Sequence, residues 1–316
     1  MLHLYSHART ALKYGLQAIG LKAGDTILVP EYICDVLLHP MNQMGIKYAY
    51  YPINDALSPM WEDMDDLVGL GTKAIIMVHY FGQPQNIRDF QSFSNDHSLL
   101  LIEDNAHGAG GRLNNQLLGT FGDVGISSEY KTLNLFCGSG LWLKNGDYET
   151  IAELKQYPVP LFQRIIKNSY ISRSKIKSIV KKYLVARPKY ENPREFRELT
   201  LPDYSIDNIS GKIIGETNWE DLISSRQKLY NYWLDYAVSN NLTPVFDKLN
   251  STANPWCFPA YVASRKEAVK WFDWGWENDV KVTSWPSLPE DILSKQGTSF
   301  HRWEKLICFG LSKRSG

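Results

Sequence analysis

At 316 residues, with 44% hydrophobic and 13% aromatic content, the chain is long enough to bury a large core and to form about two domains. Its 34 Lys and Arg residues balance 34 Asp and Glu residues, so overall charge directs it neither to nucleic acid nor to an anionic membrane surface. The four cysteines lie far apart without a Cys-x-x-Cys pair, which argues against a metal site and a disulfide framework. No apolar run is long enough to span a membrane and no signal peptide is recognisable, so we expect a cytoplasmic protein.

The first 150 residues alternate between short apolar runs and amphipathic stretches. The pattern predicts strands at 26–30, 46–53, 73–82 and 98–104, and helices at 9–21, 60–71 and 86–96. This alternation predicts an α/β fold with a mostly parallel central sheet flanked by helices. Ligands bind such sheets outside the carboxyl ends of the strands, where "VPEYIC", "VHYFG" and "EDNAH" follow three of the predicted strands. We therefore expect these three stretches to converge on one crevice.

The pattern changes after about residue 150. Residues 161–190 hold nine Lys and Arg residues and no acid. A solvated amphipathic helix at a domain junction is the simpler interpretation; the alternative is a surface for a phosphorylated substrate, a membrane face or an acidic partner. Further on, the pattern predicts helices at 217–238 and 265–278 and strands at 255–264 and 280–285. We predict a large α/β domain over residues 1–200, with 161–200 as a basic helical junction, and a smaller α+β domain over residues 201–316.

Asp104 and Lys131 are the two side chains whose surroundings suggest chemistry. Asp104 follows a buried strand, and a carboxylate there needs a cationic or hydrogen-bonding partner, of which a protonated pyridine nitrogen is one kind. Ser128 precedes Lys131 by three residues in "GDVGISSEYKTLNLFCGSG". That spacing also arises by chance, and an exposed loop lysine is the alternative interpretation of Lys131.

Taken together and in order, these stretches resemble the DegT/DnrJ/StrS family of sugar aminotransferases, which use pyridoxal 5'-phosphate (PLP) and have the aspartate aminotransferase-like fold type I. The resemblance covers nearly the whole chain and rests on "HARTALKYGLQAIGLKAGDTILVPEYIC", "TKAIIMVHYFGQP", "LLLIEDNAHGAGG", "GTFGDVGISSEYKTLNLFCGSGLWLKN", "NPWCFPAYV" and "SWPSLP". It implies transfer of an amino group from an amino acid such as glutamate to a keto-sugar in polysaccharide or cell-surface sugar biosynthesis. We expect the keto-sugar to be linked to a nucleotide. It also implies a homodimer, because the family builds its active site at a subunit interface.

The resemblance implies a role for each motif residue. Lys131 would hold PLP covalently and carry the proton between the substrate carbon and the cofactor. Asp104 would keep the pyridine nitrogen protonated, which makes the ring an electron sink. His107 would pack near the ring and its 3'-oxygen, and Ser128 would bind the phosphate.

Further cofactor contacts are expected from the N-terminal turn and from the first predicted strand. Ala8, Arg9 and Thr10 stand at the start of a predicted helix, whose N–H groups and dipole favour a phosphate. Tyr32 either borders the cofactor ring or is a core tyrosine, with equal weight on each. Glu103 is expected either to be a structural acid or to support the residues that contact the cofactor.

Two alternatives remain beside the aminotransferase. A dehydratase-like relative would also use PLP, but those family members replace the lysine by His, so Lys131 counts against it. A degenerate, non-catalytic homologue that binds a nucleotide-sugar or a biosynthetic partner is supported by the His-Ala-Arg turn at residues 7–9, which replaces the family's usual Ser-Gly-Thr or Ser-Gly-Arg turn.

Overall fold

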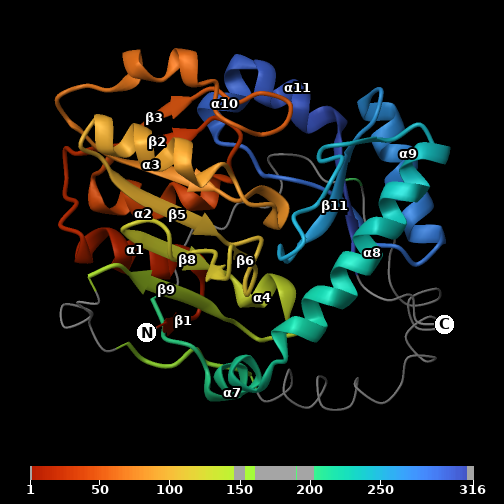
Figure 1. Ribbon diagram of the computed structural model, residues 1–316, viewed down its shortest axis with the longest axis horizontal. Coiled ribbons are helices and arrows are strands. Elements are labelled where there is room, and N and C mark those ends of the chain that lie inside the picture. The colour runs from red at the N-terminus through yellow and green to blue at the C-terminus, as the bar shows by residue number, and fades with distance from the viewer. Residues whose placement is uncertain (1, 146–153, 161–189, 191–202, 312–316) are drawn as a thin grey trace.

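The computed structural model describes residues 2–145, 154–160, 190 and 203–311 (Figure 1). The predicted basic segment at 161–190 lies outside the described residues except for Tyr190, and the predicted domain boundary at residue 200 lies outside them as well. Within the described part of the chain, no helix is both long enough and apolar enough to cross a membrane.

A seven-stranded sheet forms the centre of the larger part of the molecule, with strand order β1-β9-β8-β5-β4-β2-β3. Strands β3, β2, β4, β5 and β8 are parallel to one another, while β9 runs antiparallel to β8, and β1 antiparallel to β9. The mostly parallel α/β fold is therefore confirmed. The strands are β1 His3–Tyr5, β2 Thr26–Pro30, β3 Lys47–Tyr51, β4 Thr72–Val78, β5 Leu100–Asn105, β8 Val124–Ser127 and β9 Ser139–Leu143; a separate hairpin pairs β6 Arg112–Leu113 with β7 Gln116–Leu117.

Among the described residues, four α-helices accompany this sheet: α1 Ala8–Ala18, α2 His39–Met44, α3 Ile87–Asp96 and the short α4 Glu129–Thr132. Helix α1 lies directly on the sheet, because a Cβ added at Gly15 would stand 2.7 Å from Val124 Cγ1 and 3.0 Å from Leu141 Cδ1. Glycine at this position lets α1 approach β8 and β9 closely. That contact fixes the N-terminus of α1 relative to the strands.

The prediction of a helix over residues 60–71 is wrong. The structure has two single 3-10 turns there, Trp61–Asp63 and Asp65–Leu67. Glu62, Asp63, Asp65 and Asp66 would place like charges three and four residues apart on a helix, which destabilises it. The turns still bury Met64 against the central core.

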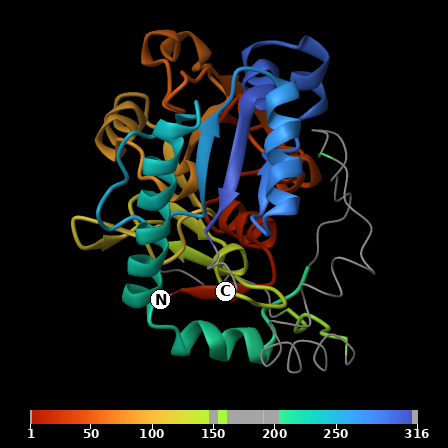
Figure 2. The same cartoon turned by 90° about the vertical axis from the view of Figure 1, so that its right-hand side faces the viewer.

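A four-stranded antiparallel sheet of order β10-β11-β13-β12 forms the second part of the molecule (Figure 2). Its strands are β10 Thr243–Pro244, β11 Cys257–Tyr261, β12 Val282–Ser284 and β13 Leu306–Gly310. The other α-helices in the described part of the chain are α7 Asn208–Glu216, α8 Trp219–Ser239, α9 Arg265–Glu277, α10 Glu290–Lys295 and α11 Thr298–Lys305. Helices α8 and α9 run alongside these strands and share one apolar cluster with Phe258 and Phe309. The sheet is thus covered on that face by its own helices.

The other face of the second sheet joins the central core. Cys257 and Cys308 belong to the same buried cluster as the strands of the central sheet. The loop after β2 is tied to the loop after β12, because Asp35 N–H donates to Ser287 O at 2.9 Å and Ser287 Oγ donates to Asp35 Oδ1 at 3.0 Å. These contacts bring the second sheet over the carboxyl ends of the parallel strands.

Candidate active site

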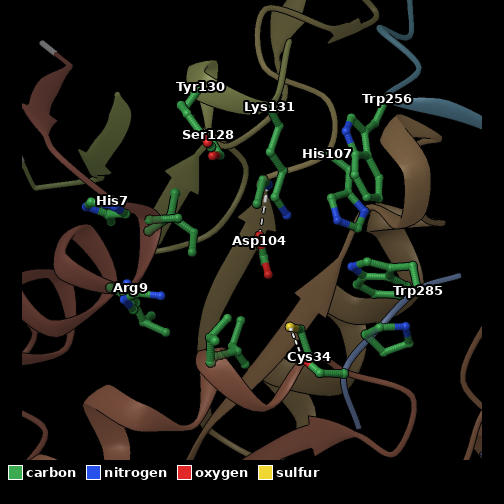
Figure 3. Close-up of a pocket in the computed structure, with 18 of the residues that line it drawn as sticks. His7, Arg9, Cys34, Asp104, His107, Ser128, Tyr130, Lys131, Trp256 and Trp285 are labelled. Carbon is green, nitrogen blue, oxygen red and sulfur yellow. Dashed lines mark hydrogen bonds between the residues drawn. The ribbon is translucent and has the colours of Figure 1, made fainter. Parts of the chain in front are cut away.

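A cavity of about 570 Å³ lies where the carboxyl ends of β2, β4, β5 and β8 face the second sheet. Figure 3 shows Asp104 and Lys131 in its middle, with His7, Arg9 and Ser128 on one side and His107, Trp256 and Trp285 on the other. All three stretches expected to converge contribute to the lining, through Cys34, Val78 and Asp104 among others. The crevice predicted from the sequence is therefore present.

Asp104 is the acid at the centre of the cavity. It lies on β5, is 6% exposed, and its Oδ1 accepts a hydrogen bond of 2.8 Å from Ala106 N–H. Among the described residues, this is the single hydrogen bond that its carboxylate accepts. Burial raises the pKa of Asp104, while the Ala106 N–H and the charge of Lys131 act in the opposite direction. The carboxylate is therefore short of partners and suited to a cationic ligand.

Lys131 is the half-buried amine beside it. The residue lies on α4 and lines the same cavity, and its Nζ stands 5.2 Å from the centroid of the Trp256 ring. Burial lowers the pKa of Lys131, and the charge of Asp104 partly offsets this effect. A lowered pKa increases the fraction of neutral amine near neutral pH, which is the form that attacks carbonyl groups and accepts protons. The alternative of an exposed loop lysine is thus excluded.

His107 forms one wall of the cavity. Its Nδ1 accepts a hydrogen bond of 3.1 Å from Phe81 N–H, so the neutral ring carries its proton on Nε2. The pKa of His107 is well below its usual value because of burial and the nearby Lys131 charge. The ring stacks on Trp256 at 4.6 Å between centroids and meets Trp285 edge-on at 4.8 Å. His107 is therefore a fixed, neutral donor.

The N-terminus of α1 forms the opposite end of the cavity. Ala8 and Arg9 line it, and the N-cap residue His7 makes no side-chain hydrogen bond to the first turn. The first-turn N–H groups and the helix dipole favour an anion at this end. Ser128 adds a hydroxyl group to the lining. This end of the cavity has the composition of a phosphate site.

Two of the predicted contact residues lie elsewhere. Thr10 is fully buried in α1 and is absent from the cavity lining. Tyr32 is also fully buried outside the lining, with its hydroxyl donating to Trp285 O and its own carbonyl accepting from Tyr80. The core interpretation of Tyr32 is the one that the structure fits, while Ile33 and Cys34 from the same loop reach the cavity.

Several lining residues were not found from the sequence. Tyr130, Trp256, Lys281 and Trp285 all line the cavity. Of these, Tyr130 stands beside Lys131 in the sequence and could have been inferred from that position. The other three come from the second sheet and its loops. The resemblance of "NPWCFPAYV" and "SWPSLP" to the family was the one available signal for Trp256 and Trp285, and Lys281 lies in neither stretch.

Comparison with known proteins agrees with this geometry. Residues 5–159 match the model of the DegT/DnrJ/EryC1/StrS aminotransferase family. Just under half of the chain is therefore similar to this family. It is similar to GDP-perosamine synthase of Vibrio cholerae, 30% identical over 43% of this chain and 37% of that protein. It is also similar to a UDP-N-acetyl-3-dehydro-alpha-D-glucosamine 3-aminotransferase of Acidithiobacillus ferrooxidans, 29% identical over 46% of this chain and 40% of that protein.

The matched region thus spans less than half the length of each of these curated relatives. Solved structures of the family extend the likeness over the whole fold. An E. coli GDP-4-keto-6-deoxy-D-mannose-3-dehydratase with bound hydrated PLP superposes with a TM-score of 0.66 at 21% identity, over 98% of this chain and 82% of that chain. The fold of this family, fold type I, is therefore confirmed.

Proposed function

We propose that the protein is a PLP-dependent aminotransferase that moves an amino group from an amino acid, glutamate by preference, to a nucleotide-linked keto-sugar in polysaccharide or cell-surface sugar biosynthesis. The observation that carries the proposal is the pairing of Asp104 and Lys131, which line one cavity, with the carboxylate short of hydrogen-bond partners. The GDP- and UDP-sugar relatives support the substrate class.

The residues of the cavity fit PLP. Asp104 offers an under-satisfied carboxylate for a protonated ring nitrogen, and His107 offers a flat, neutral ring with an Nε2–H donor. Ala8, Arg9 and Ser128 lie at the anion-favouring end, where the phosphate would be held. Lys131 is the amine that would join the cofactor covalently. When bound, the cofactor supplies an electron-withdrawing ring that stabilises negative charge on the substrate carbon.

The protein's own residues then have separate tasks. Asp104 holds a proton on the ring nitrogen, because a buried carboxylate with one hydrogen bond gains most from a cationic neighbour. Lys131 removes and returns the proton at the substrate carbon, for which its lowered pKa is suited. His107 would contact the cofactor ring, and the stacking of its own ring on Trp256 limits its movement.

The first experiment tests the covalent anchor. Purified protein is incubated with PLP, its visible spectrum is recorded, and the sample is reduced with borohydride and digested for mass spectrometry. We expect a visible band in the wild type and a PLP adduct on Lys131, both absent from Lys131→Ala. Lys73→Ala, which removes an exposed lysine of β4, should behave as the wild type. A wild type without a band or adduct would contradict the proposal.

The second experiment separates aminotransferase from the two alternatives. Glutamate added to the PLP-loaded protein should convert the bound cofactor to its amine form and release 2-oxoglutarate, and a nucleotide-linked keto-sugar should then be aminated. A deoxygenated sugar product instead would identify a dehydratase. A protein that binds the nucleotide-sugar with or without Lys131 and never turns over would be the non-catalytic homologue.

We further propose a cytoplasmic homodimer. Leu2, Ile209 and Ile213 are 37–40% exposed, and α7 lies beside the N-terminal strand in both views (Figures 1 and 2), which supports an apolar contact surface. The four cysteines are free thiols, as is usual in reducing compartments. Sedimentation analysis should give twice the chain mass, and Ile213→Glu should shift it toward the monomer; a monomeric wild type would contradict the dimer.

A further inference from the structure

The charges in the cavity lining are unbalanced. Among the described residues that line it, Arg9, Lys131 and Lys281 are the Lys and Arg side chains, and Asp104 is the one acid. A concave site with a positive excess attracts and holds anionic ligands. Even without Arg9, Lys131 and Lys281 outnumber Asp104, so the cavity is suited to a further anionic group.

Two of the three cations already have a task. Lys131 lies beside Asp104, and each influences the pKa of the other. Arg9 lies in the first turn of α1, at the end of the cavity proposed for the cofactor phosphate. Lys281 remains: within the described residues its ammonium group makes no ion pair and no hydrogen bond, and the residue is exposed.

The main chain of Lys281 is nevertheless held in place. The residue directly precedes β12, and its carbonyl accepts a hydrogen bond of 2.7 Å from Gly310 N–H on β13. A Cβ added at Gly310 would lie 3.1 Å from Lys281 Cβ, so the strand packs closely against the root of this side chain. Because the backbone and Cβ of Lys281 are held in place, its unpaired ammonium group is positioned at the cavity. Little backbone entropy would then be lost when a ligand binds.

We propose that Lys281 binds the anionic group of the substrate, an oxyanion outside the cofactor phosphate. The inference rests on the proposed function, whose two substrates each offer such a group: the α-carboxylate of the amino donor and the diphosphate of the nucleotide-sugar. Both would accept charge-assisted hydrogen bonds from the ammonium group. Lys281 is then a specificity-determining residue of the second sheet, opposite the cofactor-binding wall of the first.

The test compares PLP-loaded wild type with Lys281→Gln and Lys281→Arg. Lys305→Gln is the matched control, because Lys305 is an exposed lysine of the same part of the molecule that lies outside the cavity lining. The probes are L-glutamate, followed through the change in the visible band, and GDP and UDP, followed by calorimetry. We expect Lys281→Gln to weaken binding of one probe class by about tenfold or more, Lys281→Arg to restore most of it, and Lys305→Gln to change nothing.

The arms of the experiment identify the source of the anion. A loss confined to glutamate assigns Lys281 to the donor carboxylate, and a loss confined to GDP and UDP assigns it to the diphosphate. Unchanged binding of all probes in Lys281→Gln, or a loss of PLP affinity in that variant, overturns the inference while the proposed function stands. A wild type that never joins PLP to Lys131 overturns the proposed function and, with it, this inference.

Discussion

Two adjacent acids on β5, Glu103 and Asp104, point to opposite faces of the central sheet and have opposite surroundings. Glu103 Oε1 accepts from Gly119 N–H at 2.6 Å, and Oε2 accepts from Phe121 N–H at 2.6 Å and Gly122 N–H at 3.2 Å. With both oxygens bonded to the main chain, Glu103 is a structural acid, which is one of the two roles predicted for it from the sequence.

A histidine completes the set of partners around Glu103. His79 Nδ1 accepts from Gln85 N–H at 3.0 Å, so Nε2 carries the proton and donates to Glu103 Oε1 at 2.7 Å. Asp104 accepts a single hydrogen bond among the described residues and faces the cavity instead. Both acids are buried, but they differ in the number of hydrogen bonds that they accept. This difference distinguishes Glu103, which stabilises the fold, from Asp104, which is available to a ligand.

The largest expected effect is on catalysis, in Asp104→Asn. The amide keeps the shape of the side chain but cannot hold a proton on a cationic ring nitrogen, so we expect turnover to fall by about 10²- to 10⁴-fold. Stability should stay equal or rise, because burial raises the pKa of Asp104 in the folded state and its charged form is disfavoured there at neutral pH. Steady-state rates and thermal unfolding at pH 7.5 measure the two quantities; a variant that loses stability would contradict the comparison.

Glu103→Gln should show the reverse pattern. The amide NH₂ group would face main-chain N–H donors of Gly119 or of Phe121 and Gly122, leaving them buried without an acceptor. We expect a loss of about 2–4 kcal/mol in the free energy of unfolding, measured by urea titration. Activity per folded molecule should stay within a few-fold of wild type. A large fall in turnover at unchanged stability would place Glu103 with Asp104 instead.

The sequence predicts the parts of this arrangement that are local along the chain. Apolar runs in the sequence indicate the strands. The polar residues that follow these strands lie close together because parallel strands have their carboxyl ends at the same edge of the sheet. Asp104 was found in this way, and the resemblance to the sugar aminotransferase family pointed to His107, Ser128 and Lys131. All four residues line one cavity, while their roles stay predictions.

What the sequence could not give depends on long-range packing. Trp256, Lys281 and Trp285 reach the cavity from a second sheet more than 100 residues beyond Lys131, and no spacing rule joins them to it. Tyr32 illustrates a second limit, because a neighbouring residue, Cys34, enters the cavity while Tyr32 turns into the core. Which side of a loop faces a ligand is decided by tertiary contacts such as the bond from Tyr32 to Trp285 O.

The third prediction concerns His107 and pH. Its folded-state pKa is lowered by burial and by Lys131, so the native ring is neutral, whereas the unfolded chain takes up a proton near pH 6.5. The unfolded state therefore binds more protons below pH 6.5, and stability falls as the pH decreases, by up to about 1.4 kcal/mol per pH unit.

Urea unfolding at pH 7.5 and 5.5 measures this slope. The glutamine side chain of His107→Gln cannot take up that proton. The free energy of unfolding of this variant should therefore differ less between pH 7.5 and pH 5.5 than that of the wild type. His301→Gln, which removes an exposed histidine, should keep the wild-type difference. Equal pH dependence in wild type and His107→Gln would show that His107 is not the group responsible.

The smallest expected effect comes from Gly119→Ala. This variant distinguishes the contribution of the Glu103 carboxylate to stability from that of the loop whose N–H groups bind it. Gly119 has φ +92°, which costs an alanine conformational energy, but an added Cβ would meet no atom closer than 3.6 Å and the N–H bonded to Glu103 would remain. We expect a loss of about 1 kcal/mol with unchanged activity, against little change in Gly69→Ala, where space is open and φ is ordinary. If Gly119→Ala lowered the free energy of unfolding as much as Glu103→Gln, loop geometry rather than the carboxylate would make the main contribution to stability on that face of β5. The difference between Glu103 and Asp104 would then depend on backbone conformation and not on the number of hydrogen bonds that each acid accepts.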